Sequence, residues 1–395
     1  MNSQQPVSKP SGPKPWYDPR VRALVFQALA LAAVFWAGWV LIDNTLANME
    51  SRGISTGFGF LDQSAGFGII MHLIPYDATM SYGRTFWVGL LNTLLVSFLG
   101  IVAATILGFL LGVARLSSNW LVARLALVYI EVIRNIPLLL QIFFWYFAVL
   151  RNLPAPRQSL ELAGLAFLNN RGLYLPDPVA QEGAGALFAI CLLAVVAVVV
   201  LRIWAKRRQR ATGRIFPTFR VGLAILVLVP ALGYLVTGAP IAWDVPELRG
   251  FNYRGGLTLI PELAALWVAL SLYTAAFIAE IVRSGILSVS KGQTEASKAL
   301  GLPNGLTLRL VVIPQAMRVI IPPLTSQYLN LTKNSSLATA IGYPDLVAVF
   351  MGTTLNQTGQ AVEVVAMTMA VYLSISLFIS LLMNLYNRAV AIKER

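Results

Sequence analysis

Long apolar runs separated by shorter polar segments are the dominant pattern along this chain. A bilayer core about 30 Å thick is crossed by about 20 helical residues, so runs of this length predict membrane-spanning helices. The core of a signal peptide is shorter, about 7–15 residues, and the first run is therefore expected to be a retained anchor. The pattern predicts spans at residues 23–42, 86–114, 125–150, 186–204, 221–236, 260–282, 317–341 and 361–386.

Composition supports the same class of protein. Of the 395 residues, 57% are hydrophobic and only 12% are charged, with a mean hydropathy of +0.70. Soluble domains carry about 25% charged residues, so we expect an all-α integral membrane protein with about eight transmembrane helices. The single cysteine, Cys191, excludes an intrachain disulfide, and the lone histidine, His72, lies in a loop. No catalytic residue and no metal ligand is therefore expected.

The polar segments between the spans alternate in charge, and this predicts the topology. Some polar segments are rich in Lys and Arg, and the loops between them, such as residues 43–85, hold most of the acidic side chains. In membrane proteins, Lys and Arg are enriched in cytoplasmic segments. Both termini are therefore expected in the cytoplasm, the first as a disordered tail, and residues 43–85 on the outside. The basic segments are residues 1–22, 115–124, 202–220, 283–318 and 388–395.

A polar stretch from Ser290 to Pro314 separates the sixth and seventh spans on the expected cytoplasmic side. Ser290 and Gln293 fit a capping box, which starts a helix by satisfying its first backbone donors. Gly301 favours the left-handed conformation that ends a helix, and Asn304 is a good cap for a second helix that ends or bends at Pro314. This unit is expected either to contact a partner or to lie on the lipid surface as an amphipathic connector.

The sequence offers no energy source of its own for active transport. It contains no G-x-x-x-x-G-K-[ST] loop for ATP and no intramembrane chain of acids for proton relay. Glu131 and Glu280 lie near the membrane, and each can pair with the arginine three residues later on the same helix face. The expected ion pairs are Glu131–Arg134 and Glu280–Arg283.

Two cations fall inside predicted spans. Arg134 lies about 20 Å along the third span, and Lys333 is similarly deep in the seventh. An intramembrane cation is a candidate functional group because its burial is costly. With Gln141 near Arg134, the two cations would suit a carboxylate-bearing solute. Alternatively, Glu131 neutralises Arg134, while Lys333 reaches the lipid surface or pairs with another chain.

Three motifs resemble one family. Glu295-Ala296-Ser297, Gly301, Val311, Ile313 and Pro314 keep the spacing of the EAA loop, which reads Glu-Ala-Ala, three residues, Gly, nine residues and Ile-x-Leu-Pro. This loop is typical of type I ABC-importer permeases of the polar amino acid (His/Gln permease) group. The segments Arg134–Gln141 and Lys333–Leu337 are similar to that group's R-x-x-P-L-L-x-Q and K-x-[ST]-S-L motifs, and Tyr273–Arg283 resembles the span leading into its loop.

The resemblance implies a five-span permease core. Residues 86–387 would form the type-1 transmembrane domain, with residues 151–258 as an insertion that adds two helices, and the first span would be an extra helix. These additions are similar to the larger permease subunit of general L-amino acid importers. The helix Lys291–Leu300 would be the coupling helix, with Gly292, Gln293, Glu295, Ala296, Ser297, Lys298, Ala299 and Gly301 at or near the ATPase contact. The candidates for the substrate path are Arg134, Asn135, Gln141, Lys333, Asn334 and Ser336.

The resemblance also implies partners. A cytoplasmic ABC ATPase dimer would bind ATP and Mg, with no cofactor on this chain. A periplasmic amino-acid-binding protein would deliver solute, and a second, paralogous permease subunit would complete the path through the bacterial inner membrane, with lipid but no nucleic acid as a further partner. Two alternatives are a stand-alone secondary transporter or channel, which the missing proton carriers disfavour, and a membrane enzyme or scaffold. For the latter, the basic cluster at 202–220 lies beside a span, which favours lipid contact and topology.

Overall fold

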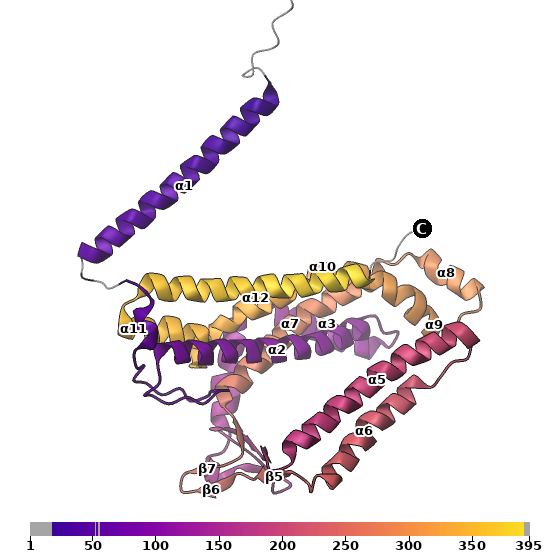
Figure 1. Ribbon diagram of the computed structural model, residues 1–395. Helices are drawn as coiled ribbons and strands as arrows, with labels where there is room; N and C mark the ends of the chain where they lie inside the picture. The colour runs from indigo at the N-terminus through magenta and orange to yellow at the C-terminus, as the bar shows by residue number, and fades with distance from the viewer. Residues whose placement is uncertain (1–17, 52, 54–55, 391–395) are drawn as a thin grey trace, which may run out of the picture.

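The computed structural model describes residues 18–51, 53 and 56–390. Within these residues, seven helices are long and apolar enough to cross a membrane, and a bent pair makes eight if it counts as one span. The predicted helical membrane fold is confirmed (Figure 1). The helices are α1 (Pro19–Ser51), α2 (Tyr82–Arg115), the bent pair α3 (Trp120–Asn135) and α4 (Leu138–Phe143), α5 (Ala184–Thr212), α6 (Thr218–Val236), α7 (Pro261–Leu287), α10 (Ile313–Asn334) and α12 (Ala361–Val390).

The predicted terminal tails are only partly covered by the structure. Residues 1–17 and 391–395 lie outside the described residues. Residues 19–22 were expected in a disordered tail, but they form the first turn of α1. Proline is favoured at such a position because the first helical N–H groups have no intrahelical acceptor.

Helix α7 is the centre of the bundle. In its most apolar window 61% of the residues are buried, against 11% in α12. It packs along α2, and α3 and α10 also contact it. A Cβ on Gly108 of α2 would lie 2.5 Å from Ile278 Cγ2, and one on Gly112 would lie 2.7 Å from the Ala279 carbonyl oxygen. The Gly108–Gly112 pair thus lies where α2 and α7 approach each other closely.

The third predicted span is not a single straight helix. After α3, the chain turns by 105° into α4, which continues through a π-helical turn, η3 (Phe144–Val149), and a 3-10 turn, η4 (Leu150–Asn152). The two residues at the bend, Ile136 and Pro137, are extended, with ψ angles of 126° and 136°. A proline lacks a backbone donor and disfavours helix at the preceding residue, and both effects end α3 here.

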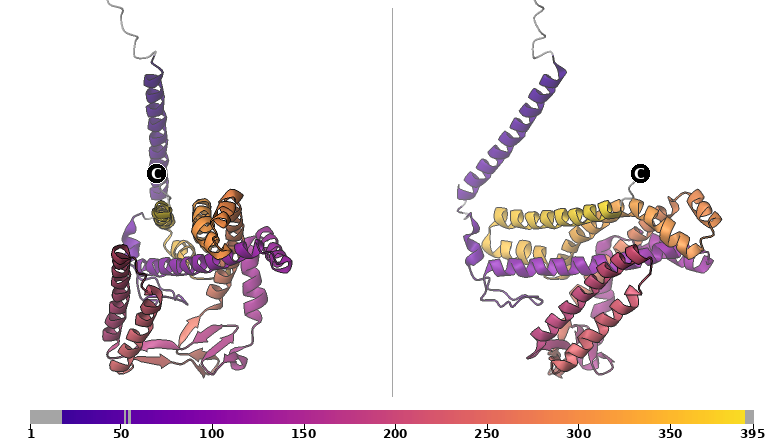
Figure 2. Two further views of the ribbon diagram at one scale, coloured as in Figure 1. Left: turned by 90° about the vertical axis from the view of Figure 1, so that its right-hand side faces the viewer. Right: turned by 45° about the vertical axis from the view of Figure 1, so that its right-hand side comes forward.

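The insertion between α4 and α7 contains short strands that the sequence did not predict. A turn η5 (Pro156–Gln158) precedes an antiparallel sheet in the order β1-β2-β3-β8, and β4–β5 and β6–β7 form two smaller sheets. Helices α5 and α6 pack mainly on each other, beside the bundle (Figure 2). The strands are β1 (Leu160–Leu162), β2 (Ala166–Asn169), β3 (Gly172–Leu175), β4 (Asp177–Ala180), β5 (Ile241–Asp244), β6 (Glu247–Arg249), β7 (Asn252–Arg254) and β8 (Leu257–Leu259).

Several basic segments of the chain lie together at one end of the bundle. The C-terminal end of α12, the connection between α5 and α6, and a short helix α8 (Lys291–Ala299) lie at one end of the molecule, which we call the basic end (Figure 1). The other end, here the far end, carries the turn η2 (Phe58–Asp62) and α11 (Leu355–Thr358). The grouping of the basic segments agrees with the charge alternation along the sequence.

Asn92 holds the far-end loops to α2. Its Nδ2 donates to the carbonyl oxygens of Met71 and Pro344, both at 2.9 Å. The backbone carbonyl oxygen of Asn92 accepts a hydrogen bond from the hydroxyl of the buried Tyr343 at 2.9 Å. These bonds fix the link between two irregular helical turns, η7 (Ser335–Ile341) and η8 (Val347–Thr354), which join α10 to α11.

Candidate functional site

The helix α8 begins where the sequence predicted but without the expected capping box. Ser290 is the N-cap residue, yet its side chain makes no capping hydrogen bond. The side chain of Gln293 instead accepts a hydrogen bond from Gln315 Nε2 on α10, at 3.4 Å. Gln293 is therefore drawn toward α10 rather than back to the start of its own helix, and the capping-box prediction is wrong.

The end of α8 follows the prediction for Gly301. This residue has a φ of +73°, in the left-handed region. Its N–H donates to the Lys298 carbonyl at 2.9 Å, and the next N–H, of Leu302, donates to the Ser297 carbonyl at 3.1 Å. These two bonds define a Schellman motif, which satisfies carbonyls at the end of a helix. The direction in which the chain leaves α8 is thereby fixed.

Ser297 anchors α8 to the next helix, α9 (Asn304–Thr307). The Ser297 side chain is 3% exposed, and its hydroxyl donates to Thr294 O at 2.8 Å and lies 3.1 Å from Thr307 Oγ1. The resemblance placed Ser297 among the contact residues, but the structure turns it inward against α9. Its role in this geometry is to hold α8 in place.

The opposite side of α8 is open. Helical residues advance by about 100° each, so Glu295 and Ala299 lie on one side, away from Ser297. Leu300, at the end of α8, is an apolar residue in a polar stretch, and its side chain is 80% exposed. Within the described chain, Glu295 forms no ion pair. Gly292, Gln293, Glu295, Ala296, Lys298, Ala299 and Gly301 are all exposed.

The second half of the polar stretch runs directly into the seventh span. Asn304 was expected to cap α9, but Pro303 occupies that position and Asn304 is the first helical residue. After α9, a π-helical turn, η6 (Leu308–Val312), leads into α10, where Pro314 lies near the start. The irregularity predicted at Pro314 therefore lies just before it, in the π-helical turn η6. Pro314 itself fits the first turn of α10, because a proline has no N–H that would need an intrahelical acceptor there.

Arg134 finds its neighbours on α7 rather than on its own helix. Its guanidinium carbon lies 5.0 Å from the centre of the Phe277 ring, within the range of a cation–π contact. Its charge also acts on Glu280, as does that of Arg115 from the end of α2. Within the described residues, no ion pair joins Glu131 to Arg134, so that predicted pairing is wrong.

The other predicted ion pair is present. Arg283 Nε donates to both carboxylate oxygens of Glu280, at 3.1 and 3.0 Å. With Arg134 and Arg115 nearby, Glu280 is a single acid among three arginines from α7, α3 and α2. The sequence did not reveal this cluster because its members are neighbours only after the helices pack.

Gln141 and Asn135 bond to backbone around the bend between α3 and α4. Gln141 is 5% exposed, and its Nε2 donates to the carbonyl oxygens of Ile133 and Ile136, both at 2.9 Å. Asn135 Nδ2 donates to the Glu131 carbonyl at 2.7 Å. Gln141 therefore occupies carbonyls that the broken helix leaves without a partner, while Asn135 adds a side-chain bond to a carbonyl in the last turn of α3.

The other substrate-path candidates lie at the end of α10. Lys333 is exposed in the last turn, where the helix dipole favours a cation. Asn334 and Ser336 are half-buried, and the Ser336 hydroxyl donates to the Lys333 carbonyl at 2.7 Å. The following turn, η7, packs against α4. The Arg134–Gln141 and Lys333–Leu337 segments are thus brought together, but neither cation is buried in this subunit.

We expect Gln141→Leu to destabilise the bend. The change removes two hydrogen bonds and leaves two carbonyls unsatisfied, which costs about 1–3 kcal/mol of unfolding free energy. The thermal unfolding midpoint in detergent measures this loss. Gln158→Leu is the matched control because Gln158 is exposed. An unchanged midpoint for Gln141→Leu would contradict the structural role.

The sequence comparisons identify the family. The family described as "Binding-protein-dependent transport system inner membrane component" matches residues 100–392. This chain belongs to that family, so it is a membrane component of a transport system that depends on a binding protein.

Several curated proteins are similar over nearly the full length. The "Putative amino-acid ABC transporter permease protein YhdX" of Escherichia coli K12 is 60% identical over 96% of each chain. The "General L-amino acid transport system permease protein AapQ" of Rhizobium johnstonii is 51% identical over 96% of this chain and 94% of its own length. The "Glutamate/glutamine/aspartate/asparagine transport system permease protein BztB" of Rhodobacter capsulatus is 43% identical over 96% of each.

Proposed function

We propose that this chain is the permease subunit of an ATP-driven importer that moves L-amino acids across the bacterial inner membrane. The observation that carries the proposal is the α8 unit at the basic end. Ser297 and Gly301 fix this short helix to α9, and it presents Glu295 and Leu300 outward. An exposed apolar side chain beside an acid that has no ion-pair partner among the described residues, in an ordered polar segment, is typical of a surface that contacts another protein. The amino acid class is supported by the names of the relatives.

Each end of the molecule would receive a different partner of the proposed importer. At the basic end, a cytoplasmic ABC ATPase dimer with ATP and Mg would receive α8. At the far end, a periplasmic amino-acid-binding protein would deliver the solute. A second, paralogous permease subunit would complete the path. In this arrangement both termini are cytoplasmic, which requires the bent pair α3–α4 to cross the membrane as one span.

The structure suggests how motion would pass from the ATPase to the membrane. The helix α8 is joined to α10 through α9 and η6, and the Gln293–Gln315 hydrogen bond adds a direct link. In turn, α10 packs on both α7 and α12. Closure of the ATPase dimer would therefore shift α10 against the bundle, which is the kind of rigid-body movement that opens a transport path to alternate sides.

For the substrate path, we expect Arg134→Ala and Lys333→Ala each to raise the solute concentration required for half-maximal uptake about tenfold. Each removes a cation that would attract a carboxylate in a low-dielectric path. The matched control is Arg157→Ala in the insertion, because Arg157 also lies over an aromatic ring, that of Phe251, at 4.9 Å. If Arg134→Ala and Lys333→Ala lowered only protein stability and left the half-maximal concentration unchanged, both cations would be structural.

Co-purification tests the proposed function directly. The chain, solubilised in mild detergent from the membranes of its own cells, is expected to purify with an ATPase and a second permease. Replacing Glu295 and Leu300 together should release the ATPase but retain the second permease. A solubilised wild-type complex that hydrolyses ATP only at background rate and contains no ATPase chain would contradict the proposal.

A further inference from the structure

The first helix, α1, is a membrane-length helix that stands clear of the bundle (Figure 1). Among the described residues, none in its apolar window is buried. In a bilayer, lipid tails cover apolar side chains as well as another helix does, so exposure alone does not identify a neighbour for α1. The neighbour of α1 can be inferred instead from the point where α1 is attached to the bundle and from the apolar groove that begins there.

The segment after α1 is fixed where α12 begins. Gly57 donates its backbone N–H to Glu363 Oε1 at 2.6 Å, in the first turn of α12. Three residues later, Phe60 is 3% exposed and packs against Tyr82, the first residue of α2. Residues 52–56 alone separate α1 from Gly57, and a chain of this length reaches at most about 20 Å. The end of α1 is therefore held close to the far ends of α2 and α12.

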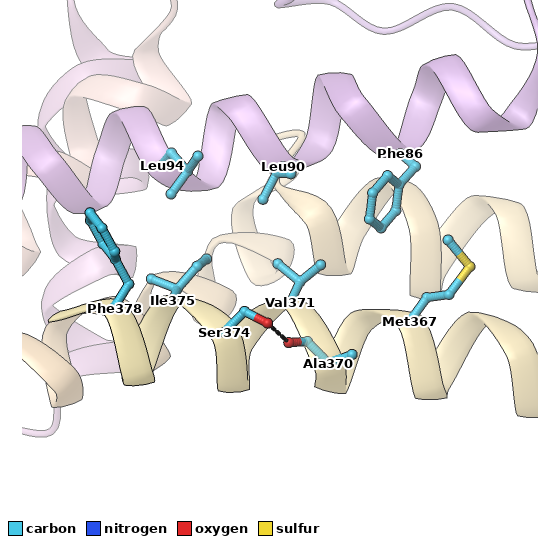
Figure 3. A pocket seen from close by; sticks show the side chains of 9 residues that line it. All are labelled: Phe86, Leu90, Leu94, Met367, Ala370, Val371, Ser374, Ile375 and Phe378. Carbon is cyan, nitrogen blue, oxygen red and sulfur yellow. Dashed lines mark hydrogen bonds between the residues drawn. The ribbon is translucent and has the colours of Figure 1, made fainter. Parts of the chain in front are cut away.

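An apolar groove runs along the bundle from that point, between α2 and α12 (Figure 3). Its first part encloses about 580 Å³, and a second cavity of about 320 Å³ continues it toward Ile101 and Met383. From Phe86 to Ile101, α2 rises about 22 Å, which is most of the thickness of a bilayer core. The groove walls include Phe86 and Leu90 of α2 and Met367, Val371, Ile375 and Phe378 of α12.

We propose that α1 packs into this groove, between α2 and α12 of its own chain. Both α2 and α12 run from the far end to the basic end, whereas α1 runs the opposite way and ends at the far end. Because residues 52–56 tether the end of α1 to Gly57, at the far ends of α2 and α12, α1 can return along both helices in the antiparallel direction. If Asp43 and Glu363, each the acid at the far end of an apolar stretch, lie at one level, then Ala33 lies close to Ser374 and Ala37 close to Ala370.

One side of α1 suits close packing. Ala30, Ala33 and Ala37 recur at intervals of three and four residues and share a helix face, which lets two helices approach closely. Trp39 and Phe35 lie on the opposite side, where they would face lipid. The groove wall requires no polar partner at this level, because the Ser374 hydroxyl already bonds the carbonyl oxygen of Ala370 (Figure 3).

Disulfide trapping in membranes tests this placement with the whole chain. Cys191, the one cysteine, is first replaced by Ser. The pairs Ala33→Cys with Ser374→Cys, and Ala37→Cys with Ala370→Cys, should then form disulfides under mild oxidation, since the β-carbons of a disulfide are about 4 Å apart. An intrachain disulfide leaves the uncleaved chain at monomer mass on a non-reducing gel, whereas a disulfide between copies gives a dimer. After cleavage at a protease site introduced after Asp43, the intrachain disulfide keeps the two fragments together.

The matched control pairs Ala32→Cys with Ser374→Cys, because residue 32 is turned about 100° away from residue 33. We expect at least about fivefold more disulfide from the Ala33 pair than from this control. Equal yields, or no disulfide in either main pair, would overturn the proposal. A disulfide formed when the two cysteines are on separately tagged copies would also overturn it, by placing α1 on a neighbouring subunit. The placement of α1 is independent of what the chain transports.

Discussion

Reversing the charge of Glu295 is expected to reduce coupled transport about thirtyfold while leaving the subunit folded. Glu295 lies on the exposed side of α8 and has no ion-pair partner among the described residues, so Glu295→Arg removes no stabilising contact within the chain. At an interface, truncating or opposing a charged group costs about 2 kcal/mol or more. A loss of this size weakens ATPase docking about thirtyfold.

ATP-dependent uptake measures the effect. The affinity of the binding protein for the solute is measured beside it and should not change. Glu161→Arg is the matched control because Glu161 is exposed in the insertion, away from α8. Glu295→Asp should retain part of the activity, since the charge is kept. Wild-type uptake by Glu295→Arg would show that α8 does not make the coupling contact.

Replacing Gly112 by leucine is expected to disrupt the centre of the bundle. A Cβ at this position would lie 2.7 Å from the Ala279 carbonyl oxygen and 2.8 Å from Val282 Cβ, so the backbone of α7 would have to move. Overpacking of this kind costs about 1–3 kcal/mol, and more where backbone is displaced. We expect a lower yield of folded protein and a lower thermal midpoint in detergent.

Gly185 offers the matched control. It lies near the start of α5, and a Cβ there would meet nothing within 4 Å, so Gly185→Leu should fold like the wild type. Gly108→Leu should behave like Gly112→Leu because it faces the same helix. A stable Gly112→Leu variant would contradict the close packing of α2 on α7.

The membrane helices could be predicted from the sequence because an apolar run of about 20 residues is typical of a helix that spans a bilayer. The sequence also predicted the turn at Gly301, where only glycine takes a positive φ without strain. The third span was expected as one stretch at residues 125–150, but the chain bends by 105° at Pro137, and the bend depends on two consecutive extended residues and on the Gln141 side chain. A change of direction of this size could not be read from one proline.

The failures have physical causes in tertiary structure. The strands of the insertion are three or four residues long, too short for an alternating pattern to stand out. Ser297 was expected at or near the ATPase contact, and the sequence did not reveal that its hydroxyl would face Thr307 on α9. Arg134 was paired with Glu131 by spacing, but Phe277 and Glu280 of α7 are its neighbours. In each case the contact partner is remote in sequence or set by packing.

We infer that this chain needs an ATPase, docked on α8, to move amino acids. Uptake into proteoliposomes tests it most directly, with the purified complex, the binding protein, ATP on the cytoplasmic side and a panel of labelled L-amino acids. We predict uptake that requires both ATP hydrolysis and the binding protein and that falls about thirtyfold with Glu295→Arg. Equal uptake with a non-hydrolysable ATP analogue, or by this chain without an ATPase, would contradict the account.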